Sequence, residues 1–206
     1  MSHIAIVGAG IGGLGAAVRL AAAGHRVTVL EKNEQPGGKM NRVESGGFQF
    51  DTGPSLITLP GVIADTFHAA GRRVEDYLTL KPVEPICRYR FADGSRLDVG
   101  SNLTRLVQEV GNLAPSEVTP LFKFLAYARA LFERAGPMFL LRERPGPKDL
   151  FSRKAPDALR IDAHISLHRA VRRFFRDERL VQLFDRYATY NGSSPFKAPG
   201  AQAIIP

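Results

Sequence analysis

The stretch IAIVGAGIGGLGAAVRL, residues 4–20, carries five glycines inside an otherwise apolar run. Glycine weakens both helices and strands, so this density indicates that something must come close to the backbone. Residues 4–7 form an uncharged run, typical of a strand buried on both faces of a parallel sheet. The pattern G-x-G-x-x-G follows from Gly8 to Gly13, and the apolar spacing after it predicts a helix that ends at Gly24.

A second uncharged run, VTVL, follows this helix and ends at Glu31. Strand, glycine turn, helix, strand and acid occur in the order of a dinucleotide-binding βαβ unit. In such a unit Gly8 permits the tight turn, Gly10 lets a diphosphate approach the backbone, and Gly13 lets the helix pack close to the strand. Glu31 can accept hydrogen bonds from a ribose diol and would repel a 2′-phosphate, which argues against NADP. Gly15 has no role in this scheme.

A second glycine pair lies just beyond the acid, in the tripeptide Gly37-Gly38-Lys39. An NAD dehydrogenase does not need such a pair at this place. The segment resembles the R-x-G-G-R segment of flavoproteins of the amine oxidase and carotenoid desaturase superfamily, which runs past the pyrophosphate and ribityl chain of the flavin. This chain lacks the first arginine of that pattern, and Lys39 replaces the second, which keeps the charge without the planar fork.

The stretch DTGPS, residues 51–55, resembles the D-x-G-P-(S/T) segment of bacterial-type phytoene desaturases, which passes close to the isoalloxazine ring. The resemblance continues in residues 70–80, 124–132 and 183–199, so it covers most of the chain in order. It implies that the cofactor is FAD. It also implies that the chain corresponds to an N-terminal portion of the longer proteins of this family. The positions that it and the βαβ unit assign to the cofactor are Gly8, Gly10, Gly12, Gly13, Glu31, Lys32, Gly37, Gly38, Lys39, Gly53, Pro54 and Ser55.

The resemblance also implies an activity, that of a FAD-dependent oxidoreductase that desaturates an acyclic carotenoid by hydride transfer to the flavin. The candidate proton acceptor is Asp149, in a proline-rich loop predicted over residues 142–157, near an acid found at the corresponding place in several of these enzymes. A carotene isomerase and a hydroxycarotenoid desaturase are alternatives in the same superfamily. A truncated, non-catalytic fragment is a further alternative. An NAD-dependent dehydrogenase is another, and the second glycine pair and residues 51–55 argue against it.

The expected fold class is α/β: a Rossmann-like FAD-binding βαβ unit, the start of a mixed sheet, and a helical substrate or membrane domain, together an incomplete fold. We divide the chain into residues 1–85, the N-terminal part of the FAD-binding domain, and residues 86–206, part of a substrate-binding domain. Apolar alternation on both sides of Asp93-Gly94 predicts a β-hairpin at the start of the second part.

The formal net charge of +8 lies mostly in residues 101–206, which hold 17 basic and 10 acidic side chains. Residues 165–184 show helical spacing, with an apolar face and an arginine face that contains Arg169 and Arg172. This pattern is typical of a membrane-surface helix and also of a core helix with solvated arginines. Because a polyene dissolves in the bilayer, we expect a cytoplasmic protein that is peripheral on the membrane.

The expected partners are a lipophilic polyene substrate and the membrane surface, with no nucleic acid; the sequence leaves the oligomeric state open. Cys87 is the single cysteine of the chain, so no intrachain disulfide can form. His164 and His168 are four residues apart but lack the H-E-x-x-H pattern. We therefore assign no metal site.

Overall fold

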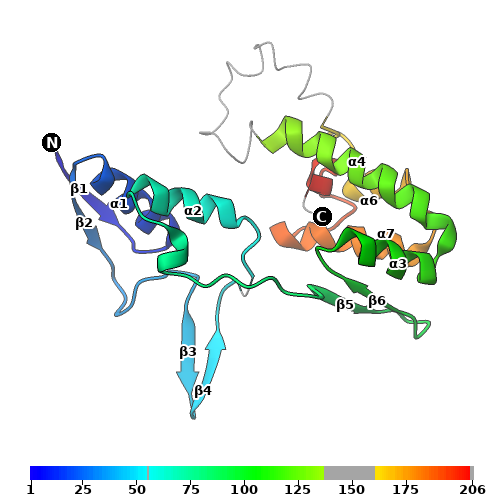
Figure 1. Ribbon diagram of the computed structural model, residues 1–206, viewed down its shortest axis with the longest axis horizontal. Helices are drawn as coiled ribbons and strands as arrows, with labels where there is room; N and C mark the ends of the chain where they lie inside the picture. Colours follow the sequence, from blue (N-terminus) through cyan, green and yellow to red (C-terminus); the bar gives the residue numbers. More distant parts are fainter. Residues whose placement is uncertain (55, 137–160, 205–206) are drawn as a thin grey trace. The chain divides into compact units, whose positions relative to one another are not determined.

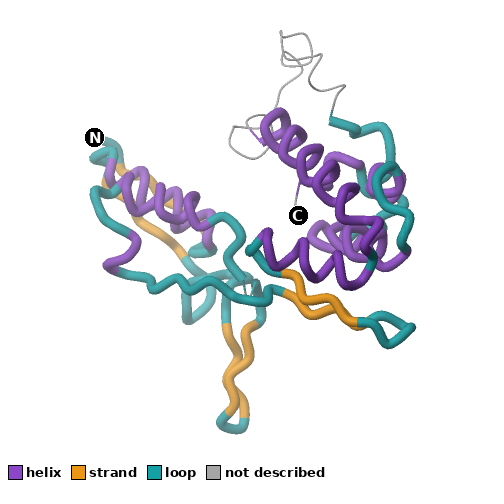
Figure 2. Tube along the Cα trace, turned by 45° about the vertical axis from the view of Figure 1, so that its right-hand side comes forward, coloured by secondary structure: helices purple, strands orange, loops and turns teal. Residues whose placement is uncertain are grey.

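The computed structural model describes residues 1–54, 56–136 and 161–204. The chain divides into two compact units, Met1–Lys81 and Pro82–Pro206 (Figure 1). The first unit contains one parallel strand pair and one antiparallel hairpin, and the second contains another hairpin and the longest helix (Figure 2). A parallel pair joined by a crossover helix makes the fold α/β, as the sequence predicts.

The first unit begins with a strand, a helix and a second strand: β1 (His3–Val7), α1 (Ile11–Ala22) and β2 (Arg26–Leu30). The two strands pair in parallel, with Ile4 opposite Val27, and α1 packs against them. Gly24 follows the helix with a φ of 86°, a left-handed conformation that glycine adopts without strain. The predicted βαβ unit and its helix stop are thereby confirmed.

The prediction that both strands are buried on both faces is wrong for this chain. Side chains along β1 and β2 alternate between half-buried and exposed, and Val7 and Leu30 at the carboxyl ends are 87% and 54% exposed. Within the described residues these strands pair only with each other. The half-buried side chains, such as Ile6, face α1. A two-stranded sheet with a single layer of helix leaves its other face open.

The rest of the first unit consists of a hairpin, a helix and one turn of 3₁₀-helix: β3 (Arg42–Ser45), β4 (Phe48–Asp51), α2 (Pro60–Ala69) and Val74–Asp76. The hairpin turns at Gly46 and Gly47, whose φ angles are both positive, as a tight two-residue turn requires. Phe48 and Phe50 alternate along β4 and are both exposed.

The second unit begins with a hairpin and continues as helices: β5 (Cys87–Arg90), β6 (Arg96–Val99), α3 (Leu103–Leu113), α4 (Val118–Ala135), α6 (Leu167–Arg172) and α7 (Glu178–Asp185). Short 3₁₀ segments cover Pro115–Glu117, Arg186–Asn191 and Gly200–Ile204. The predicted hairpin is confirmed, since the Ser95 N–H donates to Asp93 and Gly94 has a φ of 81°.

The core of the second unit is aromatic and is centred on Phe124 of α4. Its ring lies 5.5, 5.3 and 4.3 Å from the rings of Phe174, Phe175 and Phe184, measured between centroids. Leu121 and Leu131 of the same helix are also buried. Aromatic packing of this kind provides a large apolar area and fixes the geometry between α4 and α7.

The helical pattern of residues 165–184 is divided between two helices. α6 ends at Arg172, and α7 begins after Asp177, whose carboxylate caps it by accepting from the Arg179 N–H. The buried Glu117 carboxylate accepts from the backbone N–H groups of Arg176 and Asp177 in the break. Residues 165–184 therefore do not form one helix, although their apolar spacing is helical. The Glu117 carboxylate, distant in the sequence, accepts the hydrogen bonds of two backbone N–H groups at the break.

Two arginines at and just after the end of α6 form ion pairs with other residues of this unit. Arg172 pairs with Glu178 and Arg173 with Asp162. Among the described residues, no helix is long and apolar enough to cross a membrane.

Candidate functional site

The glycine turn between β1 and α1 is shaped by close backbone packing. Gly8 has a φ of 98°, and its N–H donates to the carbonyl oxygen of Leu30 at 2.7 Å. A Cβ added at Gly13 would collide with the carbonyl oxygen of Gly8, so only glycine lets α1 begin this close to β1. The roles predicted for Gly8 and Gly13 thus agree with the geometry.

The space above the first turn of α1 is open. An added Cβ at Gly12 would meet no atom within 4 Å, and one at Gly10 would meet only the Cα of Gly38 at 3.9 Å. Among the described residues, no side chain caps α1. The first N–H groups of a helix need an acceptor, and this geometry leaves room for an anionic one such as a diphosphate.

Glu31 is fixed at the carboxyl end of β2 by hydrogen bonds to both of its carboxylate oxygens. Oε2 accepts from the Ala9 N–H at 2.7 Å, and Oε1 accepts from the N–H and the side-chain amide of Asn33 at 3.0 Å each. The N–H groups of Asn33 and then of Ala9 lower the pKa of Glu31 below its usual value. The carboxylate is therefore ionised and oriented beside the glycine turn.

The second glycine pair lies directly against the first. The Gly37 N–H donates to the carbonyl oxygen of Ala9 at 2.8 Å, and Gly10 and Gly37 form a parallel bridge. Gly37 and Gly38 both have positive φ, and a Cβ at Gly38 would lie 3.0 Å from the Cα of Gly10. Both glycine segments thus line one edge of the βαβ unit, and Lys39 follows immediately.

The next segment of the predicted site packs onto this loop. A Cβ at Gly53 would collide with the carbonyl oxygen of Lys39, and the Thr52 N–H donates to that of Asn41 at 2.8 Å. Gly53 and Pro54 line a pocket with Gln35, Met40, Asn41, Arg42 and Asp51. The structure therefore brings the three predicted cofactor segments together within one unit.

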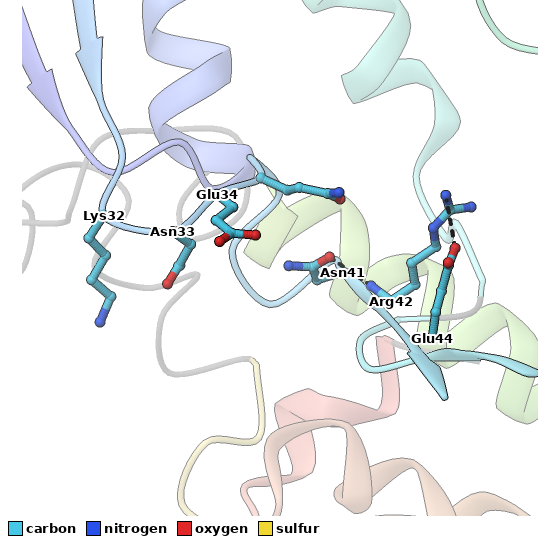
Figure 3. Close-up of a pocket in the computed structure, with 7 residues that line it drawn as sticks. Lys32, Asn33, Glu34, Asn41, Arg42 and Glu44 are labelled. Carbon is cyan, nitrogen blue, oxygen red and sulfur yellow. Dashed lines mark hydrogen bonds and ion pairs between the residues drawn. The ribbon is translucent and has the colours of Figure 1, made fainter. Parts of the chain in front are cut away.

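A neighbouring pocket opens beside Glu31 (Figure 3). It is lined by Lys32, Asn33, Glu34, Gln35, Asn41, Arg42 and Glu44. In Figure 3 the Arg42 guanidinium and the Glu44 carboxylate turn toward each other, 3.3 Å apart, at the end opposite Lys32. Sequence reasoning missed Asn33 and Arg42. Two features of the sequence could have indicated them: Asn33 is a polar residue two positions after Glu31, and Arg42 is an arginine three positions after Lys39.

Comparison with known proteins agrees with this geometry. Residues 6–74 match the family model described as an NAD(P)-binding Rossmann-like domain. The chain is 37% identical to the zeta-carotene-forming phytoene desaturase of Myxococcus xanthus over 205 residues, which is 99% of this chain and 40% of that protein. It is 35% identical to the 4,4'-diapolycopene oxygenase of Methylomonas sp over 99% of this chain and 41% of that protein. The chain is therefore similar over nearly its whole length to part of several carotenoid desaturases.

The chain spans about two fifths of the length of these relatives. Solved structures agree on the fold alone. A putrescine oxidase bound to putrescine matches with a TM-score of 0.56 at 19% identity, over 99% of this chain and 41% of that one. An oxidoreductase from Methanosarcina mazei matches with a TM-score of 0.59 at 18% identity, over 97% of this chain and 40% of that one.

The match to the NAD(P)-binding Rossmann-like model covers all three glycine segments, so the first unit resembles a dinucleotide-binding Rossmann domain. Two residues of the predicted site, Ser55 and Asp149, lie outside the described residues. Gly15, which the glycine pattern left without a role, would carry a Cβ into open space, and nothing in the structure explains it.

Proposed function

We propose that the first unit binds FAD, with the diphosphate above Gly10 and Gly12 and the adenosine ribose on Glu31. The first turn of α1 supports this, because no described side chain caps it and a Cβ added at Gly10 or Gly12 would meet no atom closer than 3.9 Å. The contact of Gly37 with the glycine turn supports FAD over NAD, since a second backbone segment there suits a longer, flavin-bearing cofactor. Gly8, Gly13, Lys32, Gly38, Lys39, Gly53, Pro54 and Ser55 complete the proposed set.

The proposed activity of the whole protein is desaturation of an acyclic carotenoid. Each step removes a hydride from an allylic carbon and a proton from its neighbour, which leaves a carbon–carbon double bond. FAD supplies the hydride acceptor when it is bound. The chain would orient the cofactor through its glycine segments, and Asp149 is our candidate for accepting the proton. Residues 86–206 would form part of the substrate-binding domain and contact the membrane surface from the cytoplasmic side.

The choice of substrate is the main alternative. The relatives of this chain include a phytoene desaturase at 37% identity, a 4,4'-diapolycopene oxygenase at 35% and a hydroxyneurosporene desaturase of Cereibacter sphaeroides at 38%. Identities this close favour none of them, so a hydroxycarotenoid desaturase or a carotene isomerase is the second candidate.

The experiment is a visible spectrum of the chain purified in detergent with added FAD. We expect flavin absorption in the wild type and its loss in Gly10→Val, whose side chain would occupy the diphosphate space. Gly15→Ala is the matched control, because its Cβ meets no atom within 4 Å and lies away from the glycine turn. If wild-type binding is weak, equilibrium dialysis measures the same difference.

Two results would contradict the proposal. Equal FAD affinity in the wild type and in Gly10→Val would place the cofactor elsewhere. Saturable binding of NADH without any binding of FAD would return the chain to the NAD-dependent class.

A further inference from the structure

A basic pocket lies in the second unit, apart from the glycine segments of the first. It is lined chiefly by His164, Ser166, His168, Arg169, Phe196 and Lys197, and its volume is about 690 Å³. Two chain segments form it, and backbone hydrogen bonds join them: Leu167 donates to Ala198 at 2.8 Å and His168 to Pro195 at 3.0 Å. The walls of the pocket are therefore fixed to each other by the backbone.

The imidazole of His168 is held in place by two contacts. Its Nδ1 lies 2.7 Å from Oδ2 of Asp185 in α7, and its ring centroid lies 4.6 Å from that of Phe196. The Asp185 side chain is only 13% exposed, and its other oxygen is buried without a hydrogen-bond partner among the described residues. With Nδ1 committed to the carboxylate, Nε2 is the nitrogen left for a ligand.

Among the described residues, the arginine and the lysine that line this pocket lack the ion pairs that other arginines in and just after α6 make. Arg172 and Arg173 at the end of α6 are paired with Glu178 and Asp162. Arg169 and Lys197, which line the pocket, make no ion pair with any described residue, and no carboxylate is among the lining residues. Cations without a carboxylate partner, next to an oriented imidazole, suit a bound oxyanion.

A metal ion is a poorer fit. The described residues contain no group of three His, Cys, Asp or Glu side chains that could hold one, although His164 and His168 are near each other. We propose that this pocket binds a phosphate group, carried either by a soluble monoester or by a lipid headgroup. Arg169 and Lys197 would supply the charge. Nε2 of His168 would accept from a phosphate P–OH group or, in the imidazolium form, donate to a phosphate oxygen, and Asp185 would act as the positioning residue of that imidazole.

The first test is a titration of the full 206-residue chain with inorganic phosphate at constant ionic strength, followed by NMR of the histidine ring signals. His168→Gln assigns the His168 signal. We expect that signal to shift with saturation in the wild type, and the affinity to fall at least about tenfold in the double variant Arg169→Gln/Lys197→Gln, which loses two charge-assisted contacts.

The control is Lys123→Gln/Arg134→Gln, which removes the same charge from α4 and changes no residue that lines the pocket. It should bind phosphate like the wild type. A second variant, Asp185→Asn, should weaken binding without removing a lining group. The proposal is overturned if the His168 signal does not saturate, or if both double variants lose the same affinity, since that would indicate general charge attraction.

The source of the phosphate is separated by two further probes. Glycerol 3-phosphate represents a soluble monoester, and phosphatidylcholine vesicles containing phosphatidic acid represent a headgroup. The site is supported if either probe binds saturably to the wild type and to Lys123→Gln/Arg134→Gln but not to Arg169→Gln/Lys197→Gln. The probe that binds in this way identifies the source of the phosphate group. Failure of both probes overturns the proposal.

Discussion

In the first unit, Ala9 and Val74 are the only buried hydrophobic residues among those described. The second unit, in contrast, buries large side chains such as Phe124, Phe175 and Leu121. The first unit depends instead on backbone segments that approach each other through glycines. A Cβ added at Gly13 or at Gly53 would collide with a carbonyl oxygen there. The two units should therefore be destabilised by opposite kinds of substitution. Added side-chain atoms should destabilise the first unit, and removal of buried side-chain atoms should destabilise the second.

This difference is what the proposed cofactor site would require. A cofactor bound by main-chain groups needs bare backbone, and among the described residues no side chain caps the first turn of α1. A helical unit without such a demand can pack side chains to full density. The predictions below test the contrast from the largest effect to the smallest.

Phe124→Ala should have the largest effect, because it empties the centre of the aromatic core of the second unit. We expect a loss of about 3–5 kcal/mol in the free energy of unfolding. Chemical denaturation followed by near-ultraviolet circular dichroism measures it. Phe122→Ala, on the same helix but 48% exposed, is the control and should change little. Similar losses in the two variants would mean that this core does not hold the unit together.

Gly13→Ala should come next, and it acts by adding a methyl group. Because that methyl group would collide with the Gly8 carbonyl, we expect a cost of about 1–3 kcal/mol in the first unit together with reduced FAD binding. Gly15→Ala adds the same atom to the same helix in open space and should be neutral or stabilise by up to ~1 kcal/mol. Hydrogen exchange of the α1 amides distinguishes the two.

Local patterns predict much of this fold. Apolar periodicity predicts the βαβ unit, the Asp93-Gly94 hairpin and α3. The positions of glycines predict the turns between these elements, and several of those glycines have a positive φ in the structure. Two features do not follow. The break between α6 and α7 depends on Glu117, a carboxylate far away in the sequence. The exposure of Val7 depends on which strands lie beside β1, and no local pattern records that.

The candidate site divides in the same way. Glycine spacing predicts Gly8, Gly13 and the second glycine pair, because each is forced by the backbone. The contact of Gly37 with Ala9 joins two loops and can be seen only in the fold. The role of Asn33 in holding Glu31 is equally invisible, since an asparagine after a strand usually indicates only a turn.

Asp177→Ala should have a smaller effect within the second unit. The carboxylate caps α7 through the Arg179 N–H and also binds the Arg179 guanidinium at 2.7 Å. We expect a loss of about 1 kcal/mol, typical of a removed cap. Asp177→Asn keeps a capping oxygen and loses the charge, so it should retain most of the stability. Equal losses in both variants would assign the effect to the ion pair instead of the cap.

The smallest effect should come from Glu31, through pH. Because the N–H groups of Asn33 and Ala9 lower the pKa of Glu31 in the folded chain, the ionised carboxylate contributes stability above the unfolded pKa of about 4.3, and this contribution is lost as the pH falls below it toward the folded pKa. Glu31→Gln should therefore flatten the pH dependence of the unfolding midpoint of the first unit as the pH falls below the unfolded pKa. Glu34→Gln is the control, since Glu34 accepts no hydrogen bond from a described residue and is exposed. An unchanged profile in Glu31→Gln would mean that the hydrogen bonds to this carboxylate do not stabilise the first unit, and that its orientation beside the glycine turn is not what supports that unit.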